Sequence, residues 1–269
     1  MADVFLLLDD DERRKILVGA AQQLGRSAQA LEKDVWVCWA LEQLWTTPKA
    51  VKMAFKGGTS LSKVYDAIER FSEDVDVTLD YRSLDPEFDP FADGISNNKL
   101  KKAGERLRTL VTSHVHDVVV PHLRARLTSV SADAPYAIEV SADGEEVRIK
   151  YRSVVDAPDG YIADSVLLEF GGRNITDPNE KHTVTPYIST ALEDVTLPSA
   201  TVDVLVGGRT FWEKATLMHV ECSRKEFKSG AERMSRHWCD LYKLADHPIG
   251  RSAVGNRALL ADVIKHKKV

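Results

Sequence analysis

Two neighbouring motifs are the most informative about the fold: Phe55-Lys56-Gly57-Gly58-Thr59-Ser60 and Phe71-Ser72-Glu73-Asp74-Val75-Asp76-Val77. The glycine pair falls between a predicted strand over 50–55 and a predicted helix over 59–68, so its turn can present backbone amides and the positive end of the helix to an anion. Asp74 and Asp76 lie one residue apart in a predicted strand over 74–79. Because side chains alternate faces along a strand, we expect both carboxylates on the same face.

Each motif alone has an ordinary explanation, since glycine pairs are common in turns and acids often alternate with valines on a solvated strand. Glu169 bears on the choice, because it lies in an otherwise apolar strand, Val166-Leu167-Leu168-Glu169-Phe170. An unpaired carboxylate there would be costly if buried. A neighbouring strand could place Glu169 beside Asp74 and Asp76 as a third acid; an edge-strand glutamate facing water is the alternative. A phosphate-binding turn beside metal-binding carboxylates is what nucleotidyl transfer requires.

Composition narrows the class of protein. The chain has 269 residues and 43% hydrophobic content, enough for a substantial core and two lobes. Its formal net charge of -5 means that any contact with nucleic acid must come from a local basic patch. Cys38, Cys222 and Cys239 have no CxxC spacing, which argues against a disulfide framework or a zinc site. No signal-peptide pattern or membrane-spanning apolar run is found, so we expect a cytoplasmic protein without a membrane partner. Nothing in the sequence sets the oligomeric state, and a monomer is the default expectation.

Apolar periodicity predicts helices before and after a central group of strands. The predicted helices cover about 10–26, 29–46, 59–68, 99–127 (kinked or split at Pro121), 210–220 and 233–245. The predicted strands cover 50–55, 74–79, 137–140, 147–151, 166–170 and 201–206. Residues 82–98 are predicted to form a loop and residues 171–200 to be irregular. This order of elements indicates the α+β class.

Two later motifs are less informative by themselves. They are Phe211-Trp212-Glu213-Lys214-Ala215-Thr216 and Arg236-His237-Trp238-Cys239-Asp240-Leu241-Tyr242. The simplest expectation is that Trp212, Leu217, Trp238 and Leu241 are core residues and that Glu213 and Lys214 are solvated helix charges. Arg236 and Asp240 are one helical turn apart and could pair on the surface.

Together, residues 56–63, residues 71–76 and these later motifs resemble the signatures of the AbiEii/MenT family, the bacterial nucleotidyltransferase toxins of abortive-infection and type IV toxin–antitoxin systems. The resemblance runs from about residue 15 to residue 245. It implies a polymerase-β-like nucleotidyltransferase lobe with a mixed sheet and N-terminal helices over 1–206. A mostly helical C-terminal lobe over 207–269 would contribute to the active site.

The resemblance also implies roles for individual residues. Asp74 and Asp76 would bind Mg2+ (or Mn2+), and Lys214 and Asp240 would complete the catalytic set, with Asp240 orienting Lys214 or an arginine. Glu169 is our candidate for a third metal ligand or a base. The implied nucleotide-binding residues are Lys56, Gly57, Gly58, Thr59, Ser60 and Ser72. Ser72 also matches a serine that a kinase antitoxin phosphorylates in some members.

The implied reaction transfers NMP from an NTP to an RNA acceptor, expected to be the 3′ end of tRNA, which blocks translation and growth. Lys101, Lys102 and Arg106 lie in a basic helical stretch that could hold RNA, as could Arg173; a solvated helix face is the alternative. A protein hydroxyl or a small molecule is an alternative acceptor, and a non-catalytic binding module is an alternative class. The family further implies a cognate antitoxin of the winged-helix or kinase type.

Overall fold

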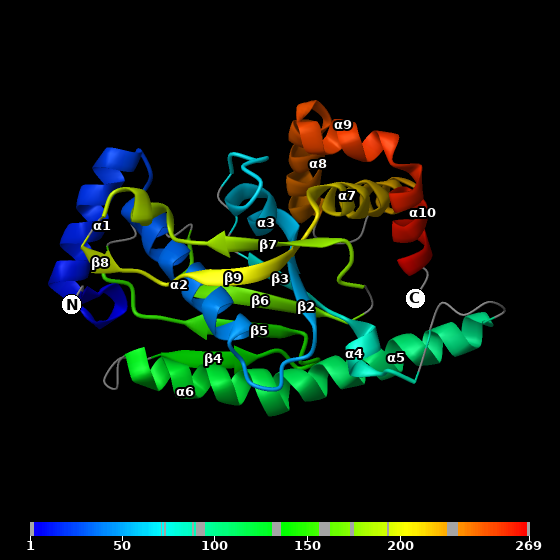
Figure 1. The fold of residues 1–269 in the computed structure, drawn as a ribbon, viewed down its shortest axis with the longest axis horizontal. Helices are drawn as coiled ribbons and strands as arrows, with labels where there is room; N and C mark the ends of the chain where they lie inside the picture. Colours follow the sequence, from blue (N-terminus) through cyan, green and yellow to red (C-terminus); the bar gives the residue numbers. More distant parts are fainter. Residues whose placement is uncertain are drawn as a thin grey trace.

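A computed structural model describes residues 3–70, 72, 74–87, 89, 95–130, 136–155, 162–172, 175–192, 194–224 and 231–267. At its centre is a mixed sheet (Figure 1) whose strand order is β4 (Ala137–Val140), β5 (Glu146–Lys150), β6 (Ser165–Gly171), β3 (Asp74–Leu79), β2 (Met53–Lys56), β9 (Ala200–Leu205) and β7 (Asn179–Val184). The β3–β6 and β2–β9 pairs are parallel and the other pairs are antiparallel. The predicted α+β class with a mixed sheet is confirmed.

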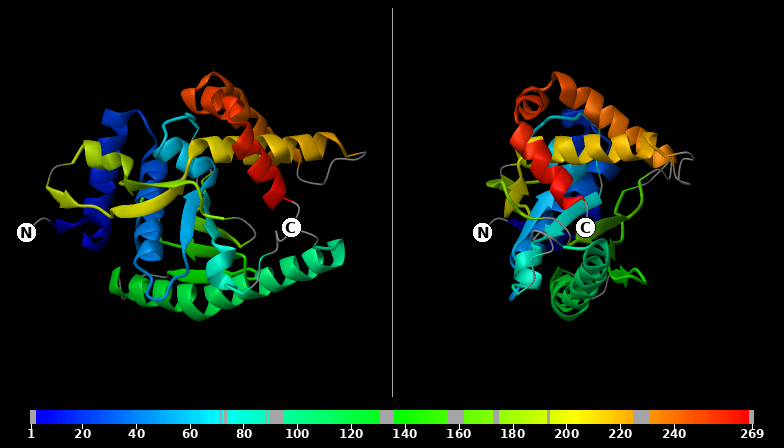
Figure 2. Two further views of the ribbon diagram at one scale, coloured as in Figure 1. Left: turned by 45° about the vertical axis from the view of Figure 1, so that its right-hand side comes forward. Right: turned by 90° about the vertical axis from the view of Figure 1, so that its right-hand side faces the viewer.

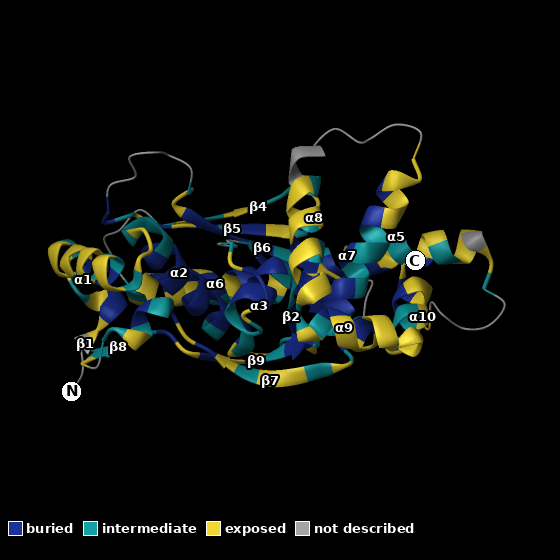
Figure 3. Cartoon of the chain, turned by 90° about the horizontal axis from the view of Figure 1, so that it is seen from above, coloured by how far each residue is buried: buried dark blue, intermediate teal, exposed yellow. Residues whose placement is uncertain are grey.

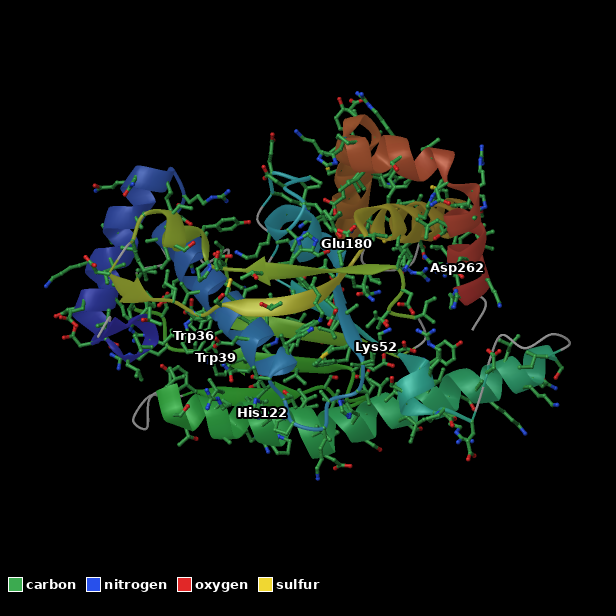
Figure 4. The ribbon with its side chains drawn as sticks, in the orientation of Figure 1. Trp36, Trp39, Lys52, His122, Glu180 and Asp262 are labelled. Carbon is green, nitrogen blue, oxygen red and sulfur yellow. The ribbon has the colours of Figure 1, made fainter. Side chains whose placement is uncertain are left out.

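One face of the sheet is covered by helices from the first half of the chain, with the first of them packed on the second. These are α1 (Asp10–Leu24), α2 (Ala28–Trp45), α5 (Asn97–His114) and α6 (Val120–Val130). Asp9 and Ser27 cap α1 and α2 by accepting backbone hydrogen bonds, as is usual at helix N-termini. Trp36 and Trp39 of α2 belong to the core that these helices form with the sheet (Figure 4), where Trp36 stacks on Tyr151.

The C-terminal helices lie on the other side of the sheet from α5 and α6 (Figure 2). They are α7 (Gly207–Cys222), α8 (Ala231–Asp246), α9 (Pro248–Gly255) and α10 (Arg257–His266). A second hydrophobic cluster joins them to α3 (Gly57–Lys63) and the segment after it, through Leu61, Ala67, Ile68, Phe211, Leu244 and Ala253. This cluster fixes the position of the C-terminal helices relative to the glycine turn.

Several predicted boundaries were wrong. Residues 171–200, predicted to be irregular, contain β7, a 3-10 turn (Tyr187–Thr190) and β8 (Val195–Thr196), which pairs with β1 (Asp3–Val4). The helix predicted to reach residue 68 ends at Lys63, and a short helix α4 (Tyr81–Leu84) begins the predicted loop.

The long helix does not end at Pro121. A π-helical turn (Val115–Val119) just before this proline separates α5 from α6. A wider turn suits this place, since proline lacks the N–H that an α-helical turn would use. In the described part of the chain, none of the helices combines the length and apolarity that crossing a bilayer needs.

Candidate active site

The paired aspartates lie on one face of β3, as their spacing predicts. Val75 and Val77 are fully buried in the core, whereas Asp74 and Asp76 line a cavity of about 350 Å³ on the other face. The parallel neighbour β6 places Glu169 directly opposite Asp76 in the register, and Glu169 lines the same cavity. The third acid therefore joins the first two by strand pairing.

Close carboxylates change one another's affinity for protons. Burial, followed by the charge of Asp76 and a hydrogen bond with it, raises the pKa of Glu169 to about 7. Among the described residues, no three His, Cys, Asp or Glu side chains form a ready-made metal cage. Mg2+ does not need one, because it commonly binds one or two carboxylates together with water and substrate phosphates. The charges of Asp74 and Asp76 already disfavour ionisation of Glu169. The same two carboxylates are suited to bind Mg2+ in this way.

The glycine turn brings the backbone very close to three side chains, those of Asp76, Arg70 and Ser72. Gly57 has a φ of +80°, and a Cβ there would lie 2.6 Å from Asp76 Cγ and would overlap its carboxylate oxygen. A Cβ at Gly58 would lie 2.7 Å from Arg70 Nη2 and 2.8 Å from Ser72 Oγ. Gly58, Arg70 and Ser72 all line the cavity. The turn thus needs glycine at the first position, for both backbone conformation and space, whereas a side chain at the second would push aside the ends of the Arg70 and Ser72 side chains.

The other residues predicted to hold nucleotide do not line the cavity with their side chains. Thr59 and Ser60 are fully buried, and their hydroxyls donate to the backbone carbonyls of Asp74 and Gly57. They therefore stabilise the turn. Lys56 Nζ lies 3.5 Å from a carboxylate oxygen of Glu213, whose charge raises the pKa of Lys56.

The C-terminal helices supply a network of charges beside the carboxylates. Asp240 of α8 is 1% exposed and accepts two hydrogen bonds from Arg70, Nε at 2.7 Å and Nη2 at 2.8 Å. Lys214 Nζ of α7 lies 3.0 Å from Asp240 Oδ2 and 3.3 Å from His237 Nδ1. Asp240 therefore pairs with Arg70 and Lys214 instead of Arg236. Figure 3 shows that other parts of α8 are exposed.

This network fixes the protonation of its members. Burial pushes the pKa of Asp240 upward, but hydrogen bonds from Arg70 and the charge of Lys214 outweigh it and hold the pKa below its ordinary value. Burial, and then the charge of Lys214, lower the pKa of His237 to about 4. At neutral pH, Asp240 is thus ionised and His237 is neutral, so the imidazole can accept a hydrogen bond from Lys214.

The sequence reasoning missed several residues that line the cavity. They are Lys33, Arg70, Arg148, Ser165 and His237. Arg236, which we expected only as a surface partner of Asp240, also lines the cavity. His237 lies inside a quoted motif, three residues before the predicted Asp240, and could have been found there. The other missed residues have no local signal, because their partners are distant in sequence.

Three of the predicted RNA-binding residues, all on α5, do not line the cavity. Lys101 and Lys102 are exposed on α5, whose first part runs out beyond the sheet (Figure 1). Arg106 pairs with Asp85, with Nε 2.7 Å from Oδ2. Arg173 lies outside the described residues.

Paired carboxylates beside a glycine turn, on a mixed sheet with helical cover, indicate a nucleotidyltransferase. More specifically, the chain belongs to the AbiEii family of nucleotidyl transferase toxins of type IV toxin–antitoxin systems, whose family model matches residues 39–269. The predicted family is therefore confirmed, and with it nucleotidyltransferase activity. Membership of a type IV toxin–antitoxin family also implies an antitoxin partner.

Among solved structures, the chain is similar to MenT4, a nucleotidyltransferase toxin from Mycobacterium tuberculosis. The two share 17% identity over 93% of this chain and 87% of that chain, with a TM-score of 0.41. A comparison with curated proteins found no match.

Proposed function

We propose that this enzyme transfers NMP from an NTP to the 3′ end of tRNA in the cytoplasm and thereby blocks translation and growth. The observation that carries the proposal is the meeting of Asp74, Asp76 and Glu169 at one cavity, with the glycine turn on one side of them. Acids that can hold a metal and an anion-binding turn are the parts that nucleotidyl transfer needs.

The nucleotide is assigned to the side of the cavity nearest the turn. Arg70, Gly58 and Ser72 meet there, and Lys214 adds a compact positive charge for a phosphate oxygen. Asp74 and Asp76 would hold Mg2+ or Mn2+, which neutralises phosphate charge when bound. Asp240 positions Arg70 and Lys214 through its three contacts, so it acts through them.

Glu169 is assigned as the base for the acceptor hydroxyl. A group whose pKa is about 7 can take a proton near neutral pH. The hydroxyl oxygen attacks the α-phosphorus, the bond to the pyrophosphate breaks, and the hydroxyl proton passes to the Glu169 carboxylate. Antitoxins of the winged-helix type would act from outside, whereas a kinase antitoxin would modify Ser72, whose hydroxyl faces Gly58 in the cavity.

Incubation of the protein with each labelled NTP, divalent metal and total RNA tests the proposal. We expect label in RNA of tRNA size, lost on addition of a chelator and lost in Asp74→Asn and Asp76→Asn. If the label appeared in protein or in a small molecule, the acceptor would be that molecule and not RNA. If Asp74→Ala left growth arrest intact, the chain would act as a binding module and the catalytic proposal would be wrong.

A further inference from the structure

His237 is the last member of the charge network beside the carboxylates. Its Nδ1 lies 3.3 Å from Lys214 Nζ, which in turn lies 3.0 Å from Asp240 Oδ2. On the other side of Asp240, Arg70 continues the network to Gly58 of the glycine turn. The four side chains thus form a row that begins at the turn and ends at His237, which lines the cavity.

The contact with Lys214 determines which ring nitrogen of His237 carries the proton. An ammonium group donates hydrogen bonds and cannot accept one, so Nδ1 must be the unprotonated nitrogen. Burial, and then the charge of Lys214, lower the pKa of His237 to about 4, which keeps the ring neutral at neutral pH. Because a neutral imidazole has a single N–H, that proton has to be on Nε2. The network therefore holds Nε2 of His237 as a hydrogen-bond donor.

This donor is available to a ligand in the cavity. The half-buried ring of His237 lines the cavity, and its Nε2 forms no hydrogen bond with any residue that the structure describes. The positive charges of Lys214 and Arg70 lie in the same row and draw an anion to this end of the cavity. An N–H group beside two cations is thus placed to donate to an anionic oxygen, which makes a stronger hydrogen bond than a neutral acceptor does.

We propose that His237 binds the triphosphate of the incoming nucleotide by a hydrogen bond from Nε2–H to a phosphate oxygen, while its Nδ1 holds the Lys214 ammonium in place. The assignment rests on the proposed function, in which the triphosphate lies between the glycine turn and Lys214. The ammonium has three N–H donors, and two of them are directed to Asp240 and His237, so the third is left for the same phosphates. A neutral ring adds a donor at a position where Lys214 and Arg70 disfavour a further positive charge.

Two substitutions separate the roles of the two ring nitrogens. The amide oxygen of asparagine can take the position of Nδ1, so His237→Asn keeps an acceptor for Lys214 and loses the donor at Nε2. The longer glutamine can place its NH2 group at the position of Nε2, so His237→Gln keeps that donor. His219→Asn is the matched control, because His219 is an exposed histidine of the neighbouring helix α7 that does not line the cavity. Thermal unfolding checks the fold of each variant.

The probe is inorganic tripolyphosphate with Mg2+, which carries the anionic part of an NTP without its base and sugar. Its dissociation constant is measured by calorimetry, and KM for NTP and for RNA is measured in the transfer assay. For His237→Asn, we expect tripolyphosphate to bind about tenfold more weakly or worse, the range of one hydrogen bond to a charged group, and KM for NTP to rise by a similar factor. KM for RNA should not change. His237→Gln should bind tripolyphosphate more tightly than His237→Asn, and His219→Asn should match the wild type.

Three results would overturn the assignment. If His237→Asn bound tripolyphosphate as tightly as the wild type, Nε2 would not contact the phosphates, and a raised KM for NTP in that variant would then indicate a contact with the base or sugar. If His237→Gln bound tripolyphosphate no better than His237→Asn, the loss would come from the ring's packing and not from the donor. A raised KM for RNA alone would assign the ring to the acceptor. The proposed function fails differently, because the wild type would then label no RNA, while the binding of tripolyphosphate would still test His237.

Discussion

Gly57→Ala tests the geometry of the site most directly, because two separate costs meet at this position. The φ of +80° disfavours any residue with a Cβ, by about 1–2 kcal/mol. The added Cβ would also lie 2.6 Å from Asp76 Cγ, closer than side chains can approach, so the Asp76 carboxylate must move. A shift of about 1 Å in a functional group can cost about 100-fold in rate. We therefore expect a modest loss of stability and a large loss of turnover.

Gly25→Ala is the matched control. Gly25 ends α1 with a φ of +64°, and a Cβ there would meet nothing within 4 Å. The control should therefore lose about 1 kcal/mol of unfolding free energy through backbone strain and keep full activity. The assays are urea unfolding, for stability, and transfer of labelled NMP with saturating NTP and metal, for turnover.

The comparison can refute the reasoning. If Gly57→Ala loses no more stability than Gly25→Ala and keeps the turnover of the wild type, Asp76 does not pack against the turn during catalysis. The assignment of Asp76 to the metal would then lose its geometric support.

Three further predictions concern other parts of the site. Lys214→Ala is expected to abolish transfer while Asp240 keeps its arginine partner, and unchanged turnover would exclude Lys214 from the site. Because the pKa of Glu169 rises from 4.5 to about 7 on folding, the folded state holds this proton more tightly than the unfolded state, and stability falls as pH rises through that window. Glu169→Gln should flatten the dependence of Tm on pH between 4.5 and about 7 in metal-free protein, and an unaltered slope would contradict the raised pKa. Reversing the charge of Lys101 and Lys102 should weaken RNA binding and reduce its salt dependence, whereas unchanged affinity would identify α5 as a solvated face.

The features predicted correctly are those that short-range periodicity determines. The strand over 74–79 has the predicted bounds, and the common face of Asp74 and Asp76 follows from the two-residue period of a strand. Glu169 was identified as unusual because a carboxylate interrupts an apolar strand. Its position opposite Asp76 depends on the register of the parallel β3–β6 pair, which the sequence does not specify.

The features that were missed depend on contacts between distant parts of the chain. β7, Asn-Glu-Lys-His-Thr-Val over 179–184, is an edge strand with mostly exposed polar residues, so it has no apolar alternation to detect. The helix from Gly57 was predicted to extend to residue 68 because its apolar residues have helical spacing. Leu61 and Ile68 are indeed buried together, but in the cluster with the C-terminal helices, and the chain turns away after Lys63.

Arg70 shows most clearly why the site exceeds the sequence motifs. Its carboxylate partner, Asp240, is 170 residues away, and its guanidinium lies against Gly58. A chain that ended at the expected lobe boundary, residue 206, would leave Arg70 without this carboxylate and expose Leu61 and Ile68. We infer that the C-terminal helices belong to the same folding and catalytic unit as the sheet, because the pair that positions Arg70 and the cluster that supports the glycine turn both need them.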